Sequence, residues 1–249
     1  MLFGKRKNVD KEAIAEKIIV ALDVDTEEEA YELVRRLSPP LTYFKVGMRL
    51  FVSSGPRIIS GLKNMGVRVF LDLKFHDIPN TVASTAAVVT RLGVDMFNIH
   101  LSGGREMIEA TVKATVAEAE KVQREVPLLI GVTVLSSFND QMLRNEVGVE
   151  RRLEHHVEQL AAMGQECGLS GVVASPREAA MLRKKFGEEF AIVTAGVRPL
   201  WASLGDQLRV STPRQALEAG ASYLVIGRPI LDHSSPREAA EKIIAEAGK

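Results

Sequence analysis

The segment VFLDLKFHDIPNTV, at residues 69–82, decides the expected fold and the expected site. Its first half alternates in the manner of a strand, so that Asp72 and Lys74 point to the same face. Asp77 follows beyond that strand, and Pro79 stands at the start of an apolar run to Leu92 that predicts a helix. The segment therefore predicts a strand that presents two charges and then leads into a helix.

The pair of Asp72 and Lys74 has two interpretations. A solvated edge strand with a surface salt bridge is the commoner setting for such a pair taken by itself. The strand residues around the pair are too apolar for an edge, and charges inside a sheet are rare unless they are paired and used. We therefore interpret both residues as part of a functional site.

The composition is that of an ordinary globular protein. Of the 249 residues, 46% are apolar and 26% are charged, which fits one barrel-type domain with a large core. The formal net charge is zero, so the sequence favours neither nucleic acid nor an anionic membrane as a partner. Any ligand preference must come from local charge.

Cysteine usage and the terminal segment both indicate the cytoplasm. The single cysteine, Cys167, excludes an internal disulfide and leaves no cysteine cluster for zinc, as suits a reducing compartment. Residues 1–17 are charged and lack the apolar centre of a signal peptide, and no later apolar run reaches membrane-spanning length. We expect a cytoplasmic protein without a targeting segment or an anchor.

Short β-rich runs alternate with amphipathic runs along the chain. The eight expected strands are 18–24, 43–47, 67–74, 96–101, 127–135, 171–175, 191–197 and 223–227. Helix starts are expected at Thr26, Pro56, Ser175, Thr212 and Ser235, and helix stops at Gly66, Gly93, Gly187 and Gly220. Eight such units without a linker predict a single (β/α)8 TIM barrel, as one α/β domain over residues 1–249. A doubly wound open sheet is the alternative, but no G-x-G-x-x-G follows the first strand.

Polar residues gather at the carboxyl ends of the expected strands, where such barrels carry their chemistry. They are Asp23, Asp25, Lys45, Asp72, Lys74, His100, Thr133, Ser136, Ser137, Arg198 and Arg228. The two arginines stand close to Gly196 and Gly227, whose backbone N–H groups can approach a ligand. Phosphate binds after the seventh and eighth strands of such barrels, so we expect the ligand to be a phosphate ester.

The charged residues on the inner face of the barrel indicate which reaction the site can carry out. Two lysines and two aspartates form the set: Lys45, Asp72, Lys74 and Asp77. With two charges of each sign, the four can be buried near neutrality while each stays ionised. The sequence has no cysteine nucleophile, no histidine pair at metal-ligand spacing and no cofactor signature. A lysine held charged beside carboxylates is a good proton donor and a poor Schiff-base nucleophile, which favours protonation of a carbanion over formation of an imine.

The run DLKFHDIPNT, at residues 72–81, closely resembles the signature of the orotidine 5'-phosphate decarboxylase family. The resemblance continues through VALD at 20–23, FKVG at 44–47, VTVLSS at 132–137, GVV at 171–173, GVRP at 196–199 and IGRPI at 226–230. Related sugar-phosphate barrels share a bare D-x-K-x-x-D, but the ten-residue run with the other blocks is specific. The resemblance implies decarboxylation of orotidine 5'-monophosphate to uridine 5'-monophosphate and CO2, the last step of de novo pyrimidine synthesis, without a cofactor.

The resemblance also implies a role for each site residue. Lys74 would protonate the ring carbon that loses CO2, while Lys45 and Asp72 complete the charge array. In a homodimer with shared active sites, Asp77 would complete the array from the neighbouring subunit. The implied substrate contacts are Asp23, Lys45, Asp72, Ile78, Thr81, Ser136, Arg198, Gln207, Gly227 and Arg228. Ser136 stands where the family usually has threonine, and the connection 199–210 has the length of a lid over the phosphate.

Two other functions stay open on the sequence. A related metal-dependent sugar-phosphate decarboxylase or aldolase would keep Asp72, Lys74 and Asp77 but would want another acidic ligand near Asp72. A non-enzymatic nucleotide-binding module is the second alternative, against which the intact charge array speaks. A turnover assay with orotidine monophosphate and a chelator separates all three.

Overall fold

Eight parallel strands close into one barrel in the computed structural model, which describes residues 11–202 and 211–248. The strands are β1 (Ile18–Ala21), β2 (Tyr43–Gly47), β3 (Arg68–Phe75), β4 (Met96–His100), β5 (Leu128–Val132), β6 (Gly171–Ala174), β7 (Ala191–Thr194) and β8 (Tyr223–Ile226). Each strand pairs with the next, and β8 returns to pair with β1. The expected (β/α)8 barrel is confirmed, and the open doubly wound sheet is excluded.

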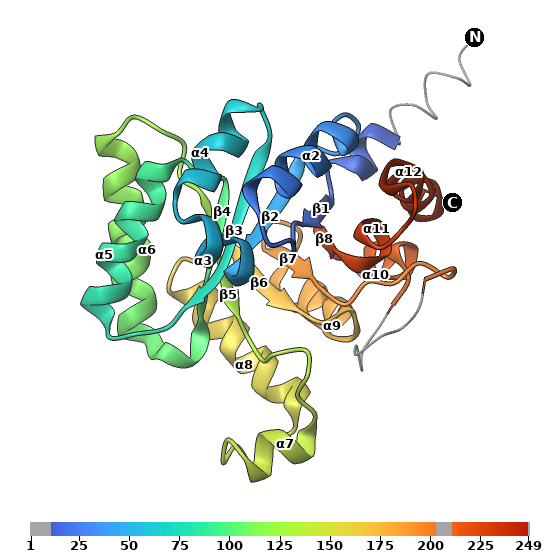
Figure 1. Cartoon of the computed structure of the whole chain (residues 1–249). Coiled ribbons are helices and arrows are strands. Elements are labelled where there is room, and N and C mark those ends of the chain that lie inside the picture. Colours follow the sequence, from blue (N-terminus) through green and yellow to red (C-terminus); the bar gives the residue numbers. More distant parts are fainter. Residues whose placement is uncertain (1–10, 203–210, 249) are drawn as a thin grey trace.

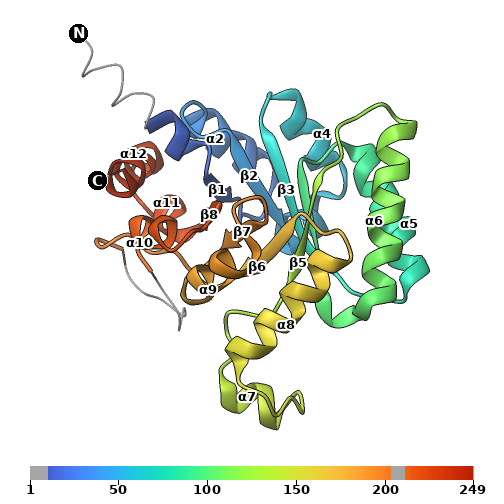
Figure 2. The same ribbon diagram turned by 180° about the vertical axis from the view of Figure 1, so that it is seen from behind.

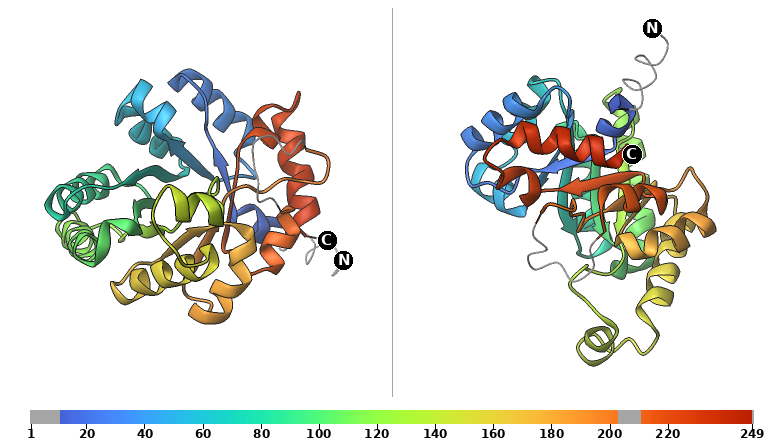
Figure 3. Two further views of the ribbon diagram at one scale, coloured as in Figure 1. Left: turned by 90° about the horizontal axis from the view of Figure 1, so that it is seen from below. Right: turned by 90° about the vertical axis from the view of Figure 1, so that its right-hand side faces the viewer.

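Helices form a ring around the strands, as the left view of Figure 3 shows. They are α2 (Glu27–Leu37), α3 (Met48–Ser54), α4 (Arg57–Asn64), α5 (Pro79–Leu92), α6 (Gly104–Lys121), α7 (Asp140–Asn145), α8 (Leu153–Glu166), α9 (Pro176–Phe186), α10 (Pro213–Glu218), α11 (Arg228–Leu231) and α12 (Pro236–Ala247), with a 3-10 turn η1 (Leu101–Gly103) after β4. Figures 1 and 2 show α7 below the body of the barrel, on the connection that follows β5. The long β5 connection therefore stands at the mouth where the strands end.

Most of the expected helix starts use the expected chemistry. Thr26 caps α2 through its Oγ1, which accepts from the Glu29 N–H at 3.2 Å, and Thr212 caps α10 in the same way. The expected helix start at Ser235 is confirmed, since α12 begins at Pro236, but the Ser235 side chain makes no cap hydrogen bond. The Ser235 N–H instead donates to Nδ1 of His233 at 3.0 Å, so this N–H is already satisfied locally.

The strand residues divide between the two sides of the barrel wall. Leu71 and Phe97 belong to the large cluster between strands and helices, whereas Tyr43, Phe70 and Met96 belong to a small separate cluster. Successive side chains of a strand point to opposite faces, so this small cluster fills the barrel interior. The residues two positions further along β2 and β3 are Lys45 and Asp72, which therefore face the interior at its carboxyl end.

Several strands are shorter than the sequence predicts, mostly at the carboxyl end. The β1 ladder ends at Ala21 and the β7 ladder at Thr194, whereas the apolar pattern extended them to 24 and 197. The residues beyond these ends include Asp23 and Arg198. Polar residues at a barrel mouth leave the ladder and turn toward a ligand site. The apolar pattern of the sequence does not indicate where this departure begins.

Candidate active site

Three strands bring four charged side chains together at the barrel mouth. Nζ of Lys45 on β2 lies 3.1 Å from Oδ1 of Asp23 and 3.4 Å from Oδ2 of Asp72. Nζ of Lys74 donates to Oδ1 of Asp72 at 2.6 Å. The Asp72 carboxylate thus lies between two ammonium groups, one on each oxygen. From here on, charge array means Asp23, Lys45, Asp72 and Lys74, so it differs from the expected set by including Asp23 and not Asp77.

The charge array is largely removed from water on the side of Asp72 and Lys45. The side chain of Lys45 exposes 9% of its surface and that of Asp72 exposes 14%. Burial alone would raise the pKa of the Asp72 carboxyl, but the Lys45 and Lys74 charges and hydrogen bonds from Lys74 and Asn98 outweigh it. The pKa of Asp72 is therefore held below its ordinary value, and the group is a carboxylate at neutral pH.

Asn98 is a site residue that the sequence reasoning missed. Its side chain is fully buried in β4, where Nδ2 donates to Oδ1 of Asp72 at 2.7 Å and Oδ1 accepts from the Lys74 N–H at 2.8 Å. One signal for it exists in the sequence. Asn98 stands two positions before His100, so the polar residue of an apolar strand shares the inward face with His100.

The backbone at Lys74 departs from the regular strand. Its φ is 53°, in the left-handed region that a lysine rarely adopts. The pairing of β3 with β4 also shifts register between Leu71 and Phe75. This irregularity, next to the charge array, has the character of the bulges that re-aim side chains beside active sites.

His100 ends β4 beside the charge array. Its ring lies 5.4 Å from that of His76, measured between centroids. Burial lowers the pKa of His100, and the nearby His76 and Lys74 lower it further, against a smaller opposite effect of Asp72. The pKa of His100 is therefore below its ordinary value, so its ring stays neutral at a more acidic pH than an ordinary histidine does.

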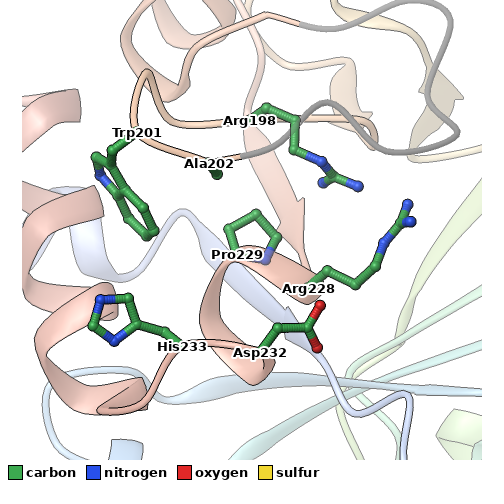
Figure 4. A pocket seen from close by; sticks show the side chains of 7 residues that line it. All are labelled: Arg198, Trp201, Ala202, Arg228, Pro229, Asp232 and His233. Carbon is green, nitrogen blue, oxygen red and sulfur yellow. The ribbon is translucent and has the colours of Figure 1, made fainter.

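A pocket of about 260 Å³ lies where β7 and β8 end. Figure 4 shows Arg198 and Arg228 extending toward one side of it, while Trp201 and His233 face each other on the other side. A methyl group added to Gly227 would lie 3.4 Å from Oδ2 of Asp23. Asp23 therefore joins the end of β8 to the charge array, so the arginine pocket and the array are neighbouring parts of one mouth.

The expected residues of the β3 connection do not join the array within one chain. Oδ1 of Asp77 accepts from the Ile78 N–H at 2.7 Å, and Asp77, Ile78 and Thr81 are all exposed. Within residues 11–202 and 211–248, no hydrogen bond or ion pair joins Asp77 to Lys45, Asp72 or Lys74. Ser136 is half-buried in the connection after β5. Gln207 lies outside the described residues.

The described part of the chain contains neither a metal-binding cluster nor a membrane-spanning helix. Among these residues, no three His, Cys, Asp or Glu side chains are arranged so that they could hold a metal ion. The described helices include none with the length and apolar character to cross a membrane.

Comparisons with known proteins agree on one family. The model of the orotidine 5'-phosphate decarboxylase / HUMPS family matches residues 16–243. The orotidine 5'-phosphate decarboxylase of Syntrophomonas wolfei is 51% identical over 232 residues, covering 93% of this chain and 97% of the relative. That of Moorella thermoacetica is 52% identical over 231 residues, covering 93% of this chain and 92% of the relative. The crystal structure of the Lactobacillus acidophilus orotidine 5'-phosphate decarboxylase superposes with a TM-score of 0.83 at 37% identity, covering 94% of this chain and all of that one.

Proposed function

The chain belongs to the orotidine 5'-phosphate decarboxylase / HUMPS family, and we propose that it converts orotidine 5'-monophosphate to uridine 5'-monophosphate and CO2 in pyrimidine biosynthesis. The observation that carries this proposal is the buried Asp72 carboxylate between the Lys45 and Lys74 ammonium groups. The neighbouring arginine pocket supplies a place for the phosphate. The enzyme is a carboxy-lyase acting without a cofactor.

The reaction explains why such an array is needed. Loss of CO2 from an sp2 ring carbon leaves a carbanion that the ring does not delocalise, so the barrier is high. Enzymes commonly lower barriers by about 8 to 23 kcal/mol, and this reaction requires the upper part of that range. Fixed charges in a site that excludes water are the most effective means of stabilising charge that develops in a transition state.

Lys74 and Asp72 divide the chemical work. The carboxylate of the bound substrate lies against Asp72, so two like charges repel until CO2 departs. The Lys74 ammonium then faces the carbanion, stabilises its charge and donates the proton that replaces CO2. The contact of 2.6 Å between Lys74 and Asp72 supports this role, because a charge-assisted hydrogen bond holds the ammonium beside Asp72.

The remaining substrate contacts follow the mouth from the ring to the phosphate. Asp23 and Lys45 bind the ribose hydroxyls, and Ser136 binds the pyrimidine through its hydroxyl. Arg198 and Arg228 bind the phosphate together with the Gly227 N–H. The bridging position of Asp23, near both Lys45 and Gly227, supports this order. Phosphate binding far from the reacting carbon supplies the energy that orients the ring.

We also propose a homodimer in which each site takes residues from both chains. Asp77 and Thr81 are exposed, and the Asp77 carboxylate accepts from the Ile78 N–H, although Lys74 of the array lies only three residues before Asp77. Apolar side chains are also exposed: Ile78 by 66% on the same connection, and Met48 and Val52 by 60% and 82% on α3, which follows the neighbouring strand β2. A second copy that covers this apolar surface would receive Asp77, Ile78 and Thr81 into its own mouth.

Two further features complete the proposal. We place the whole chain, residues 1–249, in one catalytic domain, because the family match spans residues 16–243. We place the protein in the cytoplasm, which its single free and buried cysteine supports.

The test is a turnover assay that follows orotidine 5'-monophosphate by absorbance, with and without EDTA. We expect full activity in both conditions. Loss of activity in EDTA that added metal restores would favour a metal-dependent sugar-phosphate decarboxylase or aldolase. Tight binding of uridine 5'-monophosphate without turnover would favour a nucleotide-binding module.

A further inference from the structure

The β3–β4 ladder has a gap at the charge array. Leu71 pairs with Phe97, and the next pair joins Phe75 to Ile99. Between these two pairs, β3 advances by four residues while β4 advances by two. Residues 72–74 therefore have no partner in the β4 backbone ladder. Asn98 is the single β4 residue that stands opposite this gap.

The side chain of Asn98 fills the gap in the ladder. Its Oδ1 accepts the Lys74 N–H at 2.8 Å, in the place of the backbone carbonyl that a regular parallel ladder would offer. Lys74 has a φ of 53° at this point. A non-glycine residue stays in the left-handed region only where its surroundings hold it there, and this hydrogen bond is one such restraint.

The same amide also fixes the carboxylate of Asp72. Because the Lys74 N–H requires an acceptor, Oδ1 must face Lys74 and the NH2 group must face Asp72. Nδ2 then donates to Oδ1 of Asp72 at 2.7 Å, on the oxygen that also accepts from Lys74 Nζ. Asn98 exposes none of its surface, so no water competes for either contact.

We propose that Asn98 is a positioning residue of the decarboxylation, whose amide holds the Asp72 carboxylate and the Lys74 backbone in the geometry that the reaction needs. The inference rests on the proposed function and adds a residue to it. Asn98 acts through Asp72 and Lys74 and has no contact with the substrate of its own. Its two contacts require a donor and an acceptor on one short side chain, which asparagine supplies and which leucine or ionised aspartate does not.

Two variants separate positioning from a general packing role. Asn98→Asp keeps the volume and the acceptor for the Lys74 N–H, but at neutral pH it turns a second carboxylate toward Asp72. Asn98→Leu keeps the approximate volume and removes both contacts. Thr194→Val is the matched control, because Thr194 is also a fully buried polar strand residue and its Oγ1 donates to the Tyr223 carbonyl at 3.3 Å.

We expect kcat at neutral pH to fall about a hundredfold in both Asn98 variants, since small misplacements of catalytic groups have effects of that size. Binding of uridine 5'-monophosphate should stay within about threefold, and Thr194→Val should keep the wild-type kcat. Thermal unfolding confirms that each variant is folded at the assay temperature. If Asn98→Leu does not fold, the result for Asn98→Asp decides the test, because aspartate has the same shape as asparagine.

The pH dependence of kcat distinguishes positioning from packing, because a packing defect would not change that dependence. As the pH falls, the carboxyl introduced by Asn98→Asp shares a proton with that of Asp72, and once protonated it can donate to Asp72 as asparagine does. The other titratable groups facing this pair are Lys45 from β2, Lys74 from β3 and His100 from β4, and wild type contains all three. The ratio of variant to wild-type kcat cancels their effects and should rise toward acid pH in Asn98→Asp only.

Two results would overturn the proposal while leaving the function intact. One is a kcat within about threefold of wild type in folded Asn98→Asp. The other is a loss in Asn98→Asp that is equal at every pH, as a packing defect would give. An inactive wild-type enzyme would instead refute the proposed function, so the two failures are distinct.

Discussion

Asp72 is the residue on which the contacts of the site converge. Its two carboxylate oxygens meet Lys74 Nζ at 2.6 Å, Asn98 Nδ2 at 2.7 Å and Lys45 Nζ at 3.4 Å. A buried carboxylate with this many partners stays ionised and cannot turn away from its neighbours. Asp72 therefore fixes the position of the Lys74 ammonium, which binds one of its oxygens.

Replacing Lys74 by alanine should remove turnover and spare binding. We expect kcat for Lys74→Ala to fall by at least about a thousandfold, because the lysine serves a charge that exists only after the C–C bond breaks. Binding of uridine 5'-monophosphate, measured by calorimetry, should change little. Lys63→Ala is a suitable control, since Lys63 also pairs with an aspartate, Asp95 at 2.7 Å, but at the other end of the barrel. An active Lys74→Ala enzyme would remove this residue as the proton donor.

His100 should make the stability of the protein depend on pH. Its pKa is lowered in the folded state, so below pH about 6.5 the unfolded chain binds a proton that the folded protein resists. The free energy of unfolding should therefore decrease as the pH falls from about 6.5 through the folded pKa. In urea titrations at several pH values, His100→Gln should show a weaker decrease than wild type. Exposed His155→Gln is the control, and equal slopes for wild type and His100→Gln would contradict the assignment.

The residues of the array differ in how far the sequence reveals them. Alternation in the segment 69–82 predicts that Asp72 and Lys74 share a face, and Lys45 is predicted from its place among the polar residues at the strand ends. Asn98 was not predicted, because its spacing of two from His100 indicates an inward face but not its contacts with Asp72 and Lys74. The left-handed backbone of Lys74 was also invisible, since it arises from the register of β3 against β4.

At the scale of elements, the ends of β7 and β8 form the arginine pocket. Arg198 follows β7 and Arg228 begins α11 directly after β8, so both line one pocket because these strands are neighbours in the barrel (Figure 4). The positions of both arginines were predicted, because the carboxyl ends of adjacent parallel strands lie together. Strand lengths were predicted less well, since the ladder stops where the polar residues of the mouth begin.

The pocket gives a prediction that depends on the phosphate. Arg228→Ala should weaken binding of uridine 5'-monophosphate by on the order of 2 to 5 kcal/mol, as expected for loss of a charge-assisted contact. Binding of uridine, which lacks the phosphate, should be nearly unchanged. Arg237→Ala on the exposed surface of α12 is the control for a general effect of charge. Equal losses for nucleotide and nucleoside would place Arg228 away from the phosphate.

At the scale of the whole molecule, the proposed homodimer predicts complementation between two inactive variants. Lys74→Ala and Asp77→Ala proteins are mixed in equal amounts after dissociation and allowed to reassociate. Half the dimers should be hybrids, and one of the two sites in each hybrid takes an intact Lys74 from one chain and an intact Asp77 from the other. Activity should therefore return to roughly a quarter of the wild-type value. If Asp77 served its own barrel, every site would lack one residue and mixing would restore nothing.

The pairing of β1 with β8 has a consequence for the order of folding. Ile18 pairs with Leu224, more than two hundred residues away along the chain. Such distant contacts form late, because the entropy of closing a long loop must be overcome before they give any stability. Asp23 and Gly227 flank this seam, so the ligand site is among the last parts of the molecule to take shape during refolding. Nucleotide added to refolding protein should accordingly bind after most helices have formed, and trap the barrel in its closed state.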